Sequence, residues 1–195
     1  MIYDYYSPLA LLALLGGVVG LLSQFVWIWG IWKGTMRHNI ATWLLWSVID
    51  VSVLISSVAG GAPAPFLSIG FALGAILVTT ALFFKGTWHW GALESICAVT
   101  TLACLVMWYF AGPIVAVVSL TLGKYGIAGM PAIVNAYRHP ERGQSWNWFV
   151  GALAAATNIF AAGSWTLAQG FFPSIAFIFS TIIGIIHLLR QKLKV

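Results

Sequence analysis

Charged residues are scarce in this chain. Only four carboxylates occur among 195 residues, and charged residues make up 7% of the chain against 61% for hydrophobic residues. One water-soluble core of this length cannot enclose so much apolar surface, so the remainder must face lipid. A spanning helix needs about 20 mostly apolar residues, so the chain has room for seven or eight spans and for no soluble domain. We therefore predict a single membrane domain over residues 1–195.

Catalytic and metal-binding motifs are also missing. The sequence contains no serine elbow, no phosphate-cradling glycine loop, no HExxH pair and no twin CxxC. The four His residues lack a fixed ligand spacing, and Cys97 and Cys104 lie about two turns apart in one apolar run, too far to bridge each other. We expect no enzyme activity, no metal and no cofactor. The net charge of +5 comes from helix ends rather than one basic face, so nucleic acid is not an expected partner.

Long apolar runs account for most of the chain. Gly, Pro and charged clusters separate seven of them, at residues 8–32, 39–60, 63–84, 91–110, 113–136, 145–168 and 171–189. Each run is long enough to cross a bilayer as a helix. The prediction is an all-α membrane protein with seven transmembrane helices.

Eight of the nine Lys and Arg residues fall in alternate connections. They occupy the first, third and fifth connections and the tail, whereas the second, fourth and sixth connections have none. An excess of Lys and Arg marks the cytoplasmic side of a membrane protein. We therefore expect seven spans with the N terminus outside and the C terminus in the cytoplasm, in a bacterial plasma (inner) membrane. Lys124 is the one basic residue that this topology does not explain.

The two ends of the chain follow a similar plan of one helix, a basic loop and two further helices. Short motifs recur in order: Arg37-His38 as Arg138-His139, Thr42-Trp43 as Asn147-Trp148, and the segment after Pro65 as the segment after Pro173. This plan predicts a first three-helix repeat at 8–84, a linker helix at 91–110 and a second three-helix repeat at 113–189. Because one helix separates the repeats, both enter the membrane in the same direction.

This arrangement resembles the SWEET and PQ-loop superfamily of small membrane transporters. Those proteins join two parallel three-helix repeats through a linker helix, and a Pro-Gln or related pair lies in the first helix of each repeat. Ser23-Gln24 and Met130-Pro131 each keep half of such a pair, and neither pair is complete. The resemblance implies hinges at Gln24 and Pro131 and transport by alternating access of the two repeats.

Two charged residues lie near the middle of predicted helices, Asp50 in the second and Lys124 in the fifth. A charge at this depth costs about 3 kcal/mol on insertion scales, and such residues are usually paired or functional. We predict that the two side chains form a bridge at a central cavity where a substrate would bind. A purely structural ion pair that fixes how the two halves pack is the alternative.

Four uncharged residues are candidates for the same cavity. Asn158 lies within about one helical turn of the position that corresponds to Asp50 in the other repeat. Trp46 shares a helix face with Asp50 at a spacing of four residues, Trp43 lies three residues before Trp46, and Tyr125 directly follows Lys124. The alternatives are a hydrogen bond from Asn158 to a neighbouring helix and simple packing of the three rings.

Glu94 lies a few residues into the linker helix, near Lys85 and His89. A carboxylate that snorkels at a helix N terminus, where the helix dipole favours it, is one interpretation. Proton coupling is the other.

The pattern as a whole predicts a transporter or facilitator for a small polar or zwitterionic solute. The expected partners are this solute and the lipid bilayer. The alternative is a non-transporting membrane module, either a receptor like the KDEL receptor, which is similar in fold, or a small subunit of a membrane complex. A homo-oligomer or a membrane partner subunit would then be expected.

Overall fold

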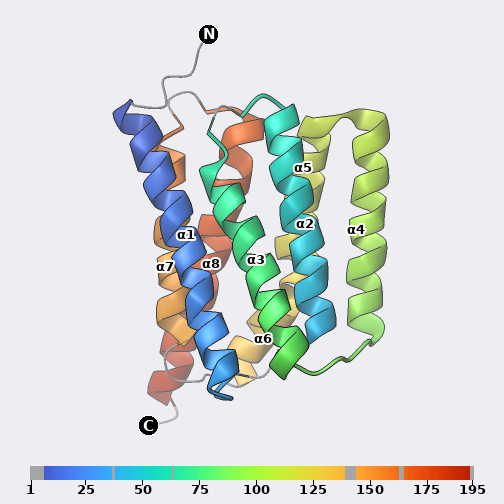
Figure 1. The fold of residues 1–195 in the computed structure, drawn as a ribbon, viewed down its shortest axis with the longest axis vertical. Coiled ribbons are helices and arrows are strands. Elements are labelled where there is room, and N and C mark those ends of the chain that lie inside the picture. Colours follow the sequence, from blue (N-terminus) through green and yellow to red (C-terminus); the bar gives the residue numbers. More distant parts are fainter. Residues whose placement is uncertain (1–6, 37, 63, 139–143, 163–164, 194–195) are drawn as a thin grey trace.

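The computed structural model describes residues 7–36, 38–62, 64–138, 144–162 and 165–193 (Figure 1). Within these ranges the chain is helical, and a single isolated bridge between Asn39 and Thr87 is the only strand-like pairing. The elements are α1 (Pro8–Trp32), α2 (Ile40–Ala59), α3 (Phe66–Lys85), α4 (Ala92–Ala111), α5 (Pro113–Leu122), the π-helical η1 (Gly123–Ala128), α6 (Met130–Arg138), α7 (Gln144–Phe160) and α8 (Leu167–Leu193).

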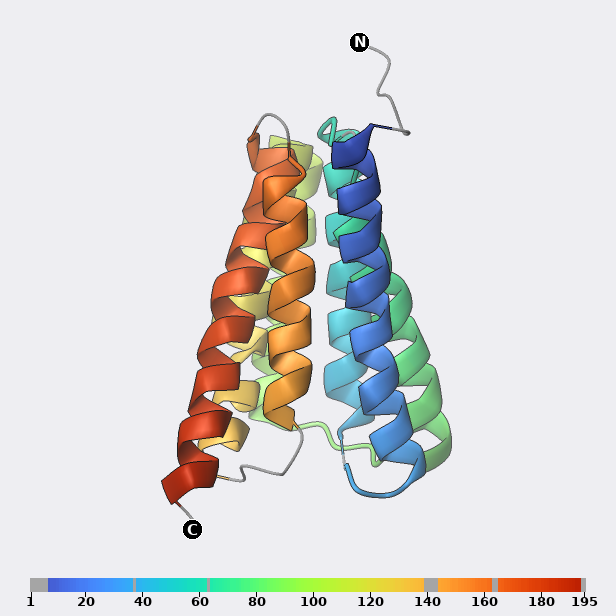
Figure 2. The same ribbon diagram turned by 90° about the vertical axis from the view of Figure 1, so that its left-hand side faces the viewer.

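Six helical stretches of the described chain are long and apolar enough to cross a bilayer. They are α1, α2, α3, α4, the continuous stretch Pro113–Arg138 and α8. The 17-residue α7 is shorter and runs alongside α8 and α1 (Figure 2). Large apolar side chains such as Leu22, Val99 and Phe110 point outward, as expected for helices surrounded by lipid. The protein is therefore a helical, multi-pass membrane protein.

The helix boundaries agree with the predicted runs except near the C terminus. The predicted end of the sixth run and the predicted start of the seventh were wrong. The sixth helix, α7, ends at Phe160 rather than at residue 168, and the seventh, α8, begins at Leu167 rather than at residue 171. Ala161, Ala162 and Trp165 lie between these helices and are apolar, and the predicted run continued across the Gly163-Ser164 pair of the sequence between them. The fifth run also differs from a uniform helix, because the π-helical η1 interrupts it.

The long helices alternate in direction, so α1, α3, the α5–α6 stretch and α8 all end at one end of the bundle (Figures 1 and 2). The basic residues of the described chain that lie at this end are Lys33, Lys85, Arg138, Arg190 and Lys192. We call this end the basic face and the other end the opposite face. Pro8 lies at the opposite face and Leu193 at the basic face.

The helices pack as two groups of three. In the first group α3 contacts both α1 and α2, and in the second α8 contacts both α7 and the α5–α6 stretch. The groups meet along α1 and α7 on one side and along α2 and α5 on the other (Figure 2). α4 lies outside both groups and packs on α5, η1 and α2 (Figure 1).

Glycines allow α1 to approach α3 in its own group and α7 in the other group closely. A Cβ on Gly17 would lie 2.5 Å from the carbonyl oxygen of Phe66, and a Cβ on Gly70 would meet the backbone of Gly17. A Cβ on Gly16 would collide with Thr157 and Asn158 of α7. Small residues at helix contacts let backbones touch in a membrane, where packing rather than water exclusion holds helices together.

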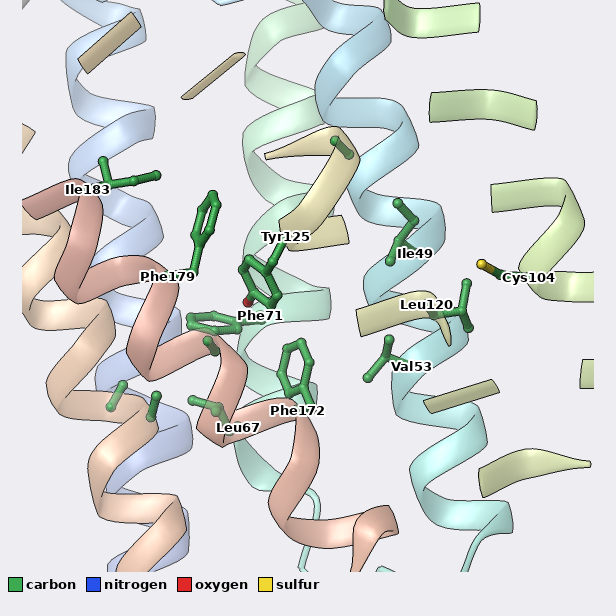
Figure 3. Packing of buried hydrophobic residues seen from close by; sticks show 14 of the residues in the cluster. Ile49, Val53, Leu67, Phe71, Cys104, Leu120, Tyr125, Phe172, Phe179 and Ile183 are labelled. Atoms are coloured by element: carbon green, nitrogen blue, oxygen red, sulfur yellow. The ribbon is translucent and has the colours of Figure 1, made fainter. Parts of the chain in front are cut away.

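The main hydrophobic cluster lies between the two groups (Figure 3). Its largest members come from α2, α3, α5, η1 and α8: Ile49, Val53, Leu67, Phe71, Leu120, Tyr125, Phe172, Phe179 and Ile183. The rings of Phe71 and Phe172 pack edge to face, with centroids 6.0 Å apart at 82°. This cluster fills the bundle at mid-depth and joins the groups.

Candidate functional site

A cavity of about 660 Å³ lies between the two groups of helices. Its lining runs from His38, His89 and Arg138 at the basic face to Asp50 and Lys124 at mid-depth. Small-molecule sites usually have volumes of about 300–1,000 Å³ and are mostly apolar with a few polar groups. This cavity fits that description and ends on the two charges that the sequence places within the membrane.

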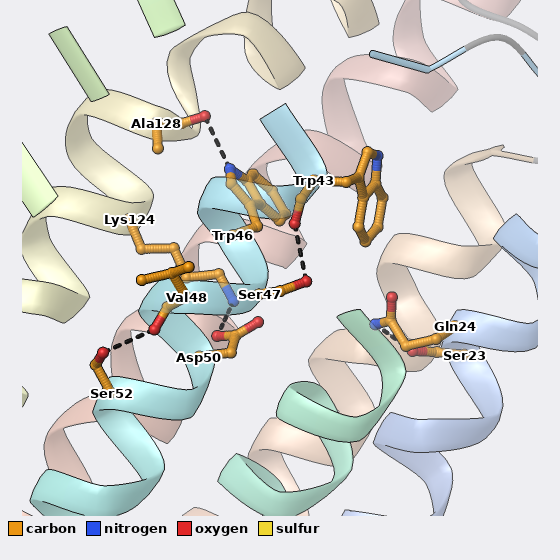
Figure 4. A network of polar contacts seen from close by, with 10 residues as sticks. All are labelled: Ser23, Gln24, Trp43, Trp46, Ser47, Val48, Asp50, Ser52, Lys124 and Ala128. Carbon is orange, nitrogen blue, oxygen red and sulfur yellow. Dashed lines mark hydrogen bonds and ion pairs between the residues drawn. The ribbon is translucent and has the colours of Figure 1, made fainter. Parts of the chain in front are cut away.

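Asp50 and Lys124 form a buried ion pair at the inner end of the cavity. The Lys124 ammonium donates a hydrogen bond to Asp50 Oδ1, and each side chain is only 3% exposed (Figure 4). The bridge that we predicted between these residues is confirmed. Among the described residues Asp50 Oδ2 has no hydrogen-bond donor, so one carboxylate oxygen remains available at the cavity.

Four aromatic rings surround the Lys124 ammonium. Its nitrogen lies 5.1 Å from the ring centroid of Tyr125, 5.2 Å from Trp46, 5.4 Å from Phe71 and 5.6 Å from Phe172. All four distances fall within the range of cation–π attraction, which is strongest where water is excluded. We call these four residues the aromatic cage.

Lys124 is held by an unusual segment of backbone. It belongs to η1, the six-residue π-helical turn between α5 and α6. Such turns carry one extra residue and often mark functional sites. Gly123, Gly126 and Gly129 lie in and beside this turn. The π-turn was not predicted, although three glycines around a buried lysine are a sequence signal for irregular backbone.

The predicted aromatic residues Trp43, Trp46 and Tyr125 all line the cavity. The Trp46 indole N–H donates to the carbonyl of Ala128, at 3.3 Å, which links α2 to the end of η1 (Figure 4). The rings of Trp43 and Trp46 pack against each other with centroids 5.6 Å apart. These contacts build one wall of the cavity from residues one turn apart on α2.

Asn158 lies outside the cavity, and its predicted place there was wrong. Its side-chain amide donates to the carbonyl of Ala13, at 3.3 Å, and to that of Ala154, at 3.1 Å, so it ties α7 to α1. Asp50 follows the start of α2 at Ile40 by ten residues, whereas Asn158 follows the start of α7 at Gln144 by fourteen. The extra turn carries Asn158 past the inner end of the cavity.

Of the two predicted hinge residues, Gln24 and Pro131, the structure describes the side-chain contacts of Gln24. Gln24 lines the cavity, packs over Gly74 and donates a hydrogen bond to Ser23 Oγ at 3.3 Å. Pro131 lies in the first turn of α6, and its side chain is outside the described part of the structure. Hinge motion at either residue stays a prediction.

Glu94 joins α4 to α2 at the rim of the cavity. Its carboxylate accepts hydrogen bonds from the Gly91 N–H at 3.0 Å, the Asn39 side-chain amide at 2.8 Å and the Thr42 hydroxyl at 3.1 Å. The side chain is 8% exposed, so it does not snorkel into solvent as one interpretation proposed. It caps the start of α4 instead, while proton coupling stays a prediction.

Unpaired polar atoms gather around the outer half of the cavity. The described chain has six buried side-chain nitrogen or oxygen atoms without a hydrogen-bond partner, and four belong to residues that line the cavity: His38, Asn147, Trp148 and His187. Native proteins keep such atoms few, because each costs the hydrogen bonds that water would provide. Their clustering indicates a place where water or a solute completes the structure.

His38 illustrates the chemistry of this outer half. Burial lowers the pKa of His38 from 6.5 to about 4, because the charged imidazolium loses its hydration. Its ring packs edge to face on Trp27, with centroids 5.1 Å apart at 74°. Trp27 packs in turn on Trp148, at 5.8 Å. The outer half of the cavity therefore has an uncharged, aromatic wall.

Comparison of the chain with protein-family models, curated proteins and solved structures found no match. The resemblance to SWEET and PQ-loop transporters stays a prediction. The geometry of the cavity is therefore the basis for assigning a function.

Proposed function

We propose that the protein is a transporter or facilitator for a small polar or zwitterionic solute and that it works by alternating access. The observation that carries the proposal is the cavity of about 660 Å³, which leads from the basic face to the Asp50–Lys124 pair at mid-depth. Transporters of this kind bind their solute near the bilayer midplane, between two repeats.

The helix contacts support an architecture of two parallel three-helix repeats. In each group the third helix lies between the other two: α3 between α1 and α2, and α8 between the α5–α6 stretch and α7. The contacts between the groups show the same correspondence of helices. The first helix of the first group, α1, contacts the second helix of the second group, α7. The first helix of the second group, the α5–α6 stretch, likewise contacts the second helix of the first group, α2. α4 then serves as the linker in a seven-helix arrangement of the SWEET and PQ-loop type.

The cavity reaches one end of the bundle and is closed toward the other, as one state of an alternating-access transporter requires. The cavity reaches the basic face, whereas Phe71 and Phe172 pack against each other beside the ion pair, and Val53, Leu67 and Leu120 are all but fully buried around them. By the positive-inside bias the basic face is cytoplasmic, which places the N terminus outside a bacterial inner membrane. The structure then corresponds to an inward-open state.

The ion pair favours a solute without net charge. A zwitterion can place its cation on Asp50 and its anion on Lys124, so that every buried charge keeps a partner. A dianion or a dication would leave an unpaired charge at a depth where this is costly. Asp50 Oδ2, to which no described residue donates, gives the solute a first point of contact in the cavity.

Counterflow into proteoliposomes tests the proposal. We expect wild-type protein to exchange at least one labelled zwitterion, and Asp50→Asn and Lys124→Ala to abolish exchange per folded molecule. Ser52→Ala is the matched control, because Ser52 is buried on α2 and, within the described ranges, its hydroxyl hydrogen-bonds to the Val48 carbonyl of its own helix alone. Unchanged exchange in both charge variants would remove the pair from the mechanism. Binding of solute without any exchange is the result expected of a receptor.

A further inference from the structure

We propose that the aromatic cage is the binding site for the ammonium group of the solute, and that Lys124 occupies it only while the solute is absent. This inference rests on the proposed function, because it names the chemical class of the transported solute: a small amine that also carries an anionic group. Lys124 would act as a tethered substitute for the ligand.

The site has the two components that recognise an alkylammonium ion. A carboxylate, Asp50, supplies the counter-charge, and the four rings of the cage lie 5.1 to 5.6 Å from the nitrogen now inside. A structural ion pair needs only the carboxylate and its hydrogen bonds. Aromatic rings add attraction for a desolvated ammonium, and aromatic cages of this kind bind ligand cations.

Lys124 is attached in a way that permits exchange. Its ammonium makes one hydrogen bond to a charged partner, Asp50, and its other contacts of note are with ring faces. Its backbone lies in the π-turn η1, and a Cβ on Gly126 in the same turn would meet nothing within 4 Å. Because the cavity borders both residues of the pair, the ammonium on its long flexible stem has space beside it to move into when it leaves the cage.

Charge balance explains why the solute must be bifunctional. When Lys124 leaves the cage, its ammonium needs a new anion, and the described residues around the cavity offer only Asp50 and, at the rim, Glu94. Glu94 already accepts three hydrogen bonds from α2 and its own helix end. An anionic group on the solute meets the need, because it pairs with Lys124 while the solute amine pairs with Asp50.

Chemical rescue of Lys124→Ala tests the inference. This variant removes three methylene groups and the ammonium, and leaves Asp50 and the cage in place. We expect its melting temperature in nanodiscs to rise with added methyl-, ethyl- or propylammonium chloride, and propylammonium to act at the lowest concentration because it replaces the missing atoms. Ligands that bind only the folded state raise stability with the logarithm of their concentration.

Two control variants separate this effect from general stabilisation. Asp50→Asn/Lys124→Ala lacks the counter-charge, and Lys124→Met fills the cage with an uncharged side chain of similar length, so neither should respond to propylammonium. Tetrapropylammonium should fail with Lys124→Ala, because the space left by one lysine stem is too small for it. An equal shift in all variants, or no shift in Lys124→Ala, overturns the inference.

A wild-type experiment covers the case in which Lys124→Ala does not fold. Norvaline, pentylamine and pentanoate share one carbon chain and differ in their charged groups. We expect norvaline to stabilise wild-type protein at lower concentration than either single-charge analogue, and binding of pentanoate at equal strength overturns the inference. Failure of the proposed function is a separate result: rescue by propylammonium with no counterflow of any amine would leave a cation site in a protein that does not transport.

Discussion

Asp50 and Lys124 depend on each other for their burial. Removing one partner of a buried pair typically costs about 3–5 kcal/mol, because the remaining charge is left without compensation. We expect Asp50→Asn and Lys124→Met each to lower the free energy of unfolding by about this amount, and the double variant to lose less than the sum of the two. Reversible unfolding in mixed micelles provides the measurement. Additive losses would mean that the two charges do not interact.

His38 provides a pH signal from outside the spanning helices. Its pKa is about 4 in the folded protein and 6.5 when unperturbed, so between these values the unfolded chain binds the proton more readily. Stability should therefore be highest above about pH 6.5 and should decrease as the pH falls toward 4.

The matched variant for this effect is His38→Phe, which keeps a ring against Trp27 and cannot titrate. Melting temperatures measured from pH 4 to 8 should show a steeper acid loss for wild-type protein than for His38→Phe. Parallel curves would contradict the assignment of a buried neutral imidazole.

Single residues differed in how well the sequence predicted their roles. Asp50 and Lys124 stand out because a charge within an apolar helix has few explanations. Asn158 was misplaced because it lies one helical turn beyond the depth of Asp50 in its own helix, and one turn decides between the cavity and a packing contact. Trp27 and Trp148 lie near basic helix ends, where Trp is common as an interfacial anchor, yet both line the cavity, because the rotation of each helix decides which way a ring points.

At the scale of elements, close helix contacts depend on glycines that differ sharply in their surroundings. Gly17 faces the α3 backbone, whereas a Cβ on Gly126 would meet nothing within 4 Å. We expect Gly17→Ala to lower the free energy of unfolding by about 1–3 kcal/mol through overpacking. Gly126→Ala, the control, should be neutral or should stabilise by up to about 1 kcal/mol. Equal effects of the two substitutions, measured by thermal unfolding in nanodiscs, would exclude α1–α3 backbone contact.

The attachment of α4 depends on Glu94. Glu94→Gln keeps the size of the side chain but weakens the charge-assisted hydrogen bonds to Gly91, Asn39 and Thr42. We expect a loss of about 1–2 kcal/mol and faster amide hydrogen exchange in the first turns of α4, with little change in α1. Unchanged exchange in α4 would show that its packing on α5 holds it without this carboxylate.

Element boundaries followed from the sequence wherever a polar or Gly-Pro break interrupts hydropathy. Between α7 and α8 the sequence has a short Gly163-Ser164 break beside the apolar Ala161, Ala162 and Trp165, and the predicted run continued across it to residue 168. The π-turn at η1 was not predicted because hydropathy is insensitive to one extra residue in a helix. The sequence signal for irregular backbone there is the group of three glycines, Gly123, Gly126 and Gly129, around Lys124.

For the whole molecule, composition and the alternation of Lys and Arg predicted the helical membrane class correctly. The described structure places basic helix ends together at one face, as that alternation requires. The cavity was anticipated only as the surroundings of two buried charges. Its volume and its aromatic cage arise from three-dimensional packing of α2, α3, η1 and α8, which no single segment encodes.

Alternating access is the central claim, and sided labelling of Ser180→Cys tests it most directly. Ser180 is buried and lines the cavity, and the variant would be made in a background with Cys97 and Cys104 replaced by Ala. A membrane-impermeant thiol reagent should label it from the basic face at rest and also from the opposite face during exchange, while Ser56→Cys, fully buried away from the cavity, stays unlabelled. Labelling from one face alone, whether or not solute is present, would contradict the account.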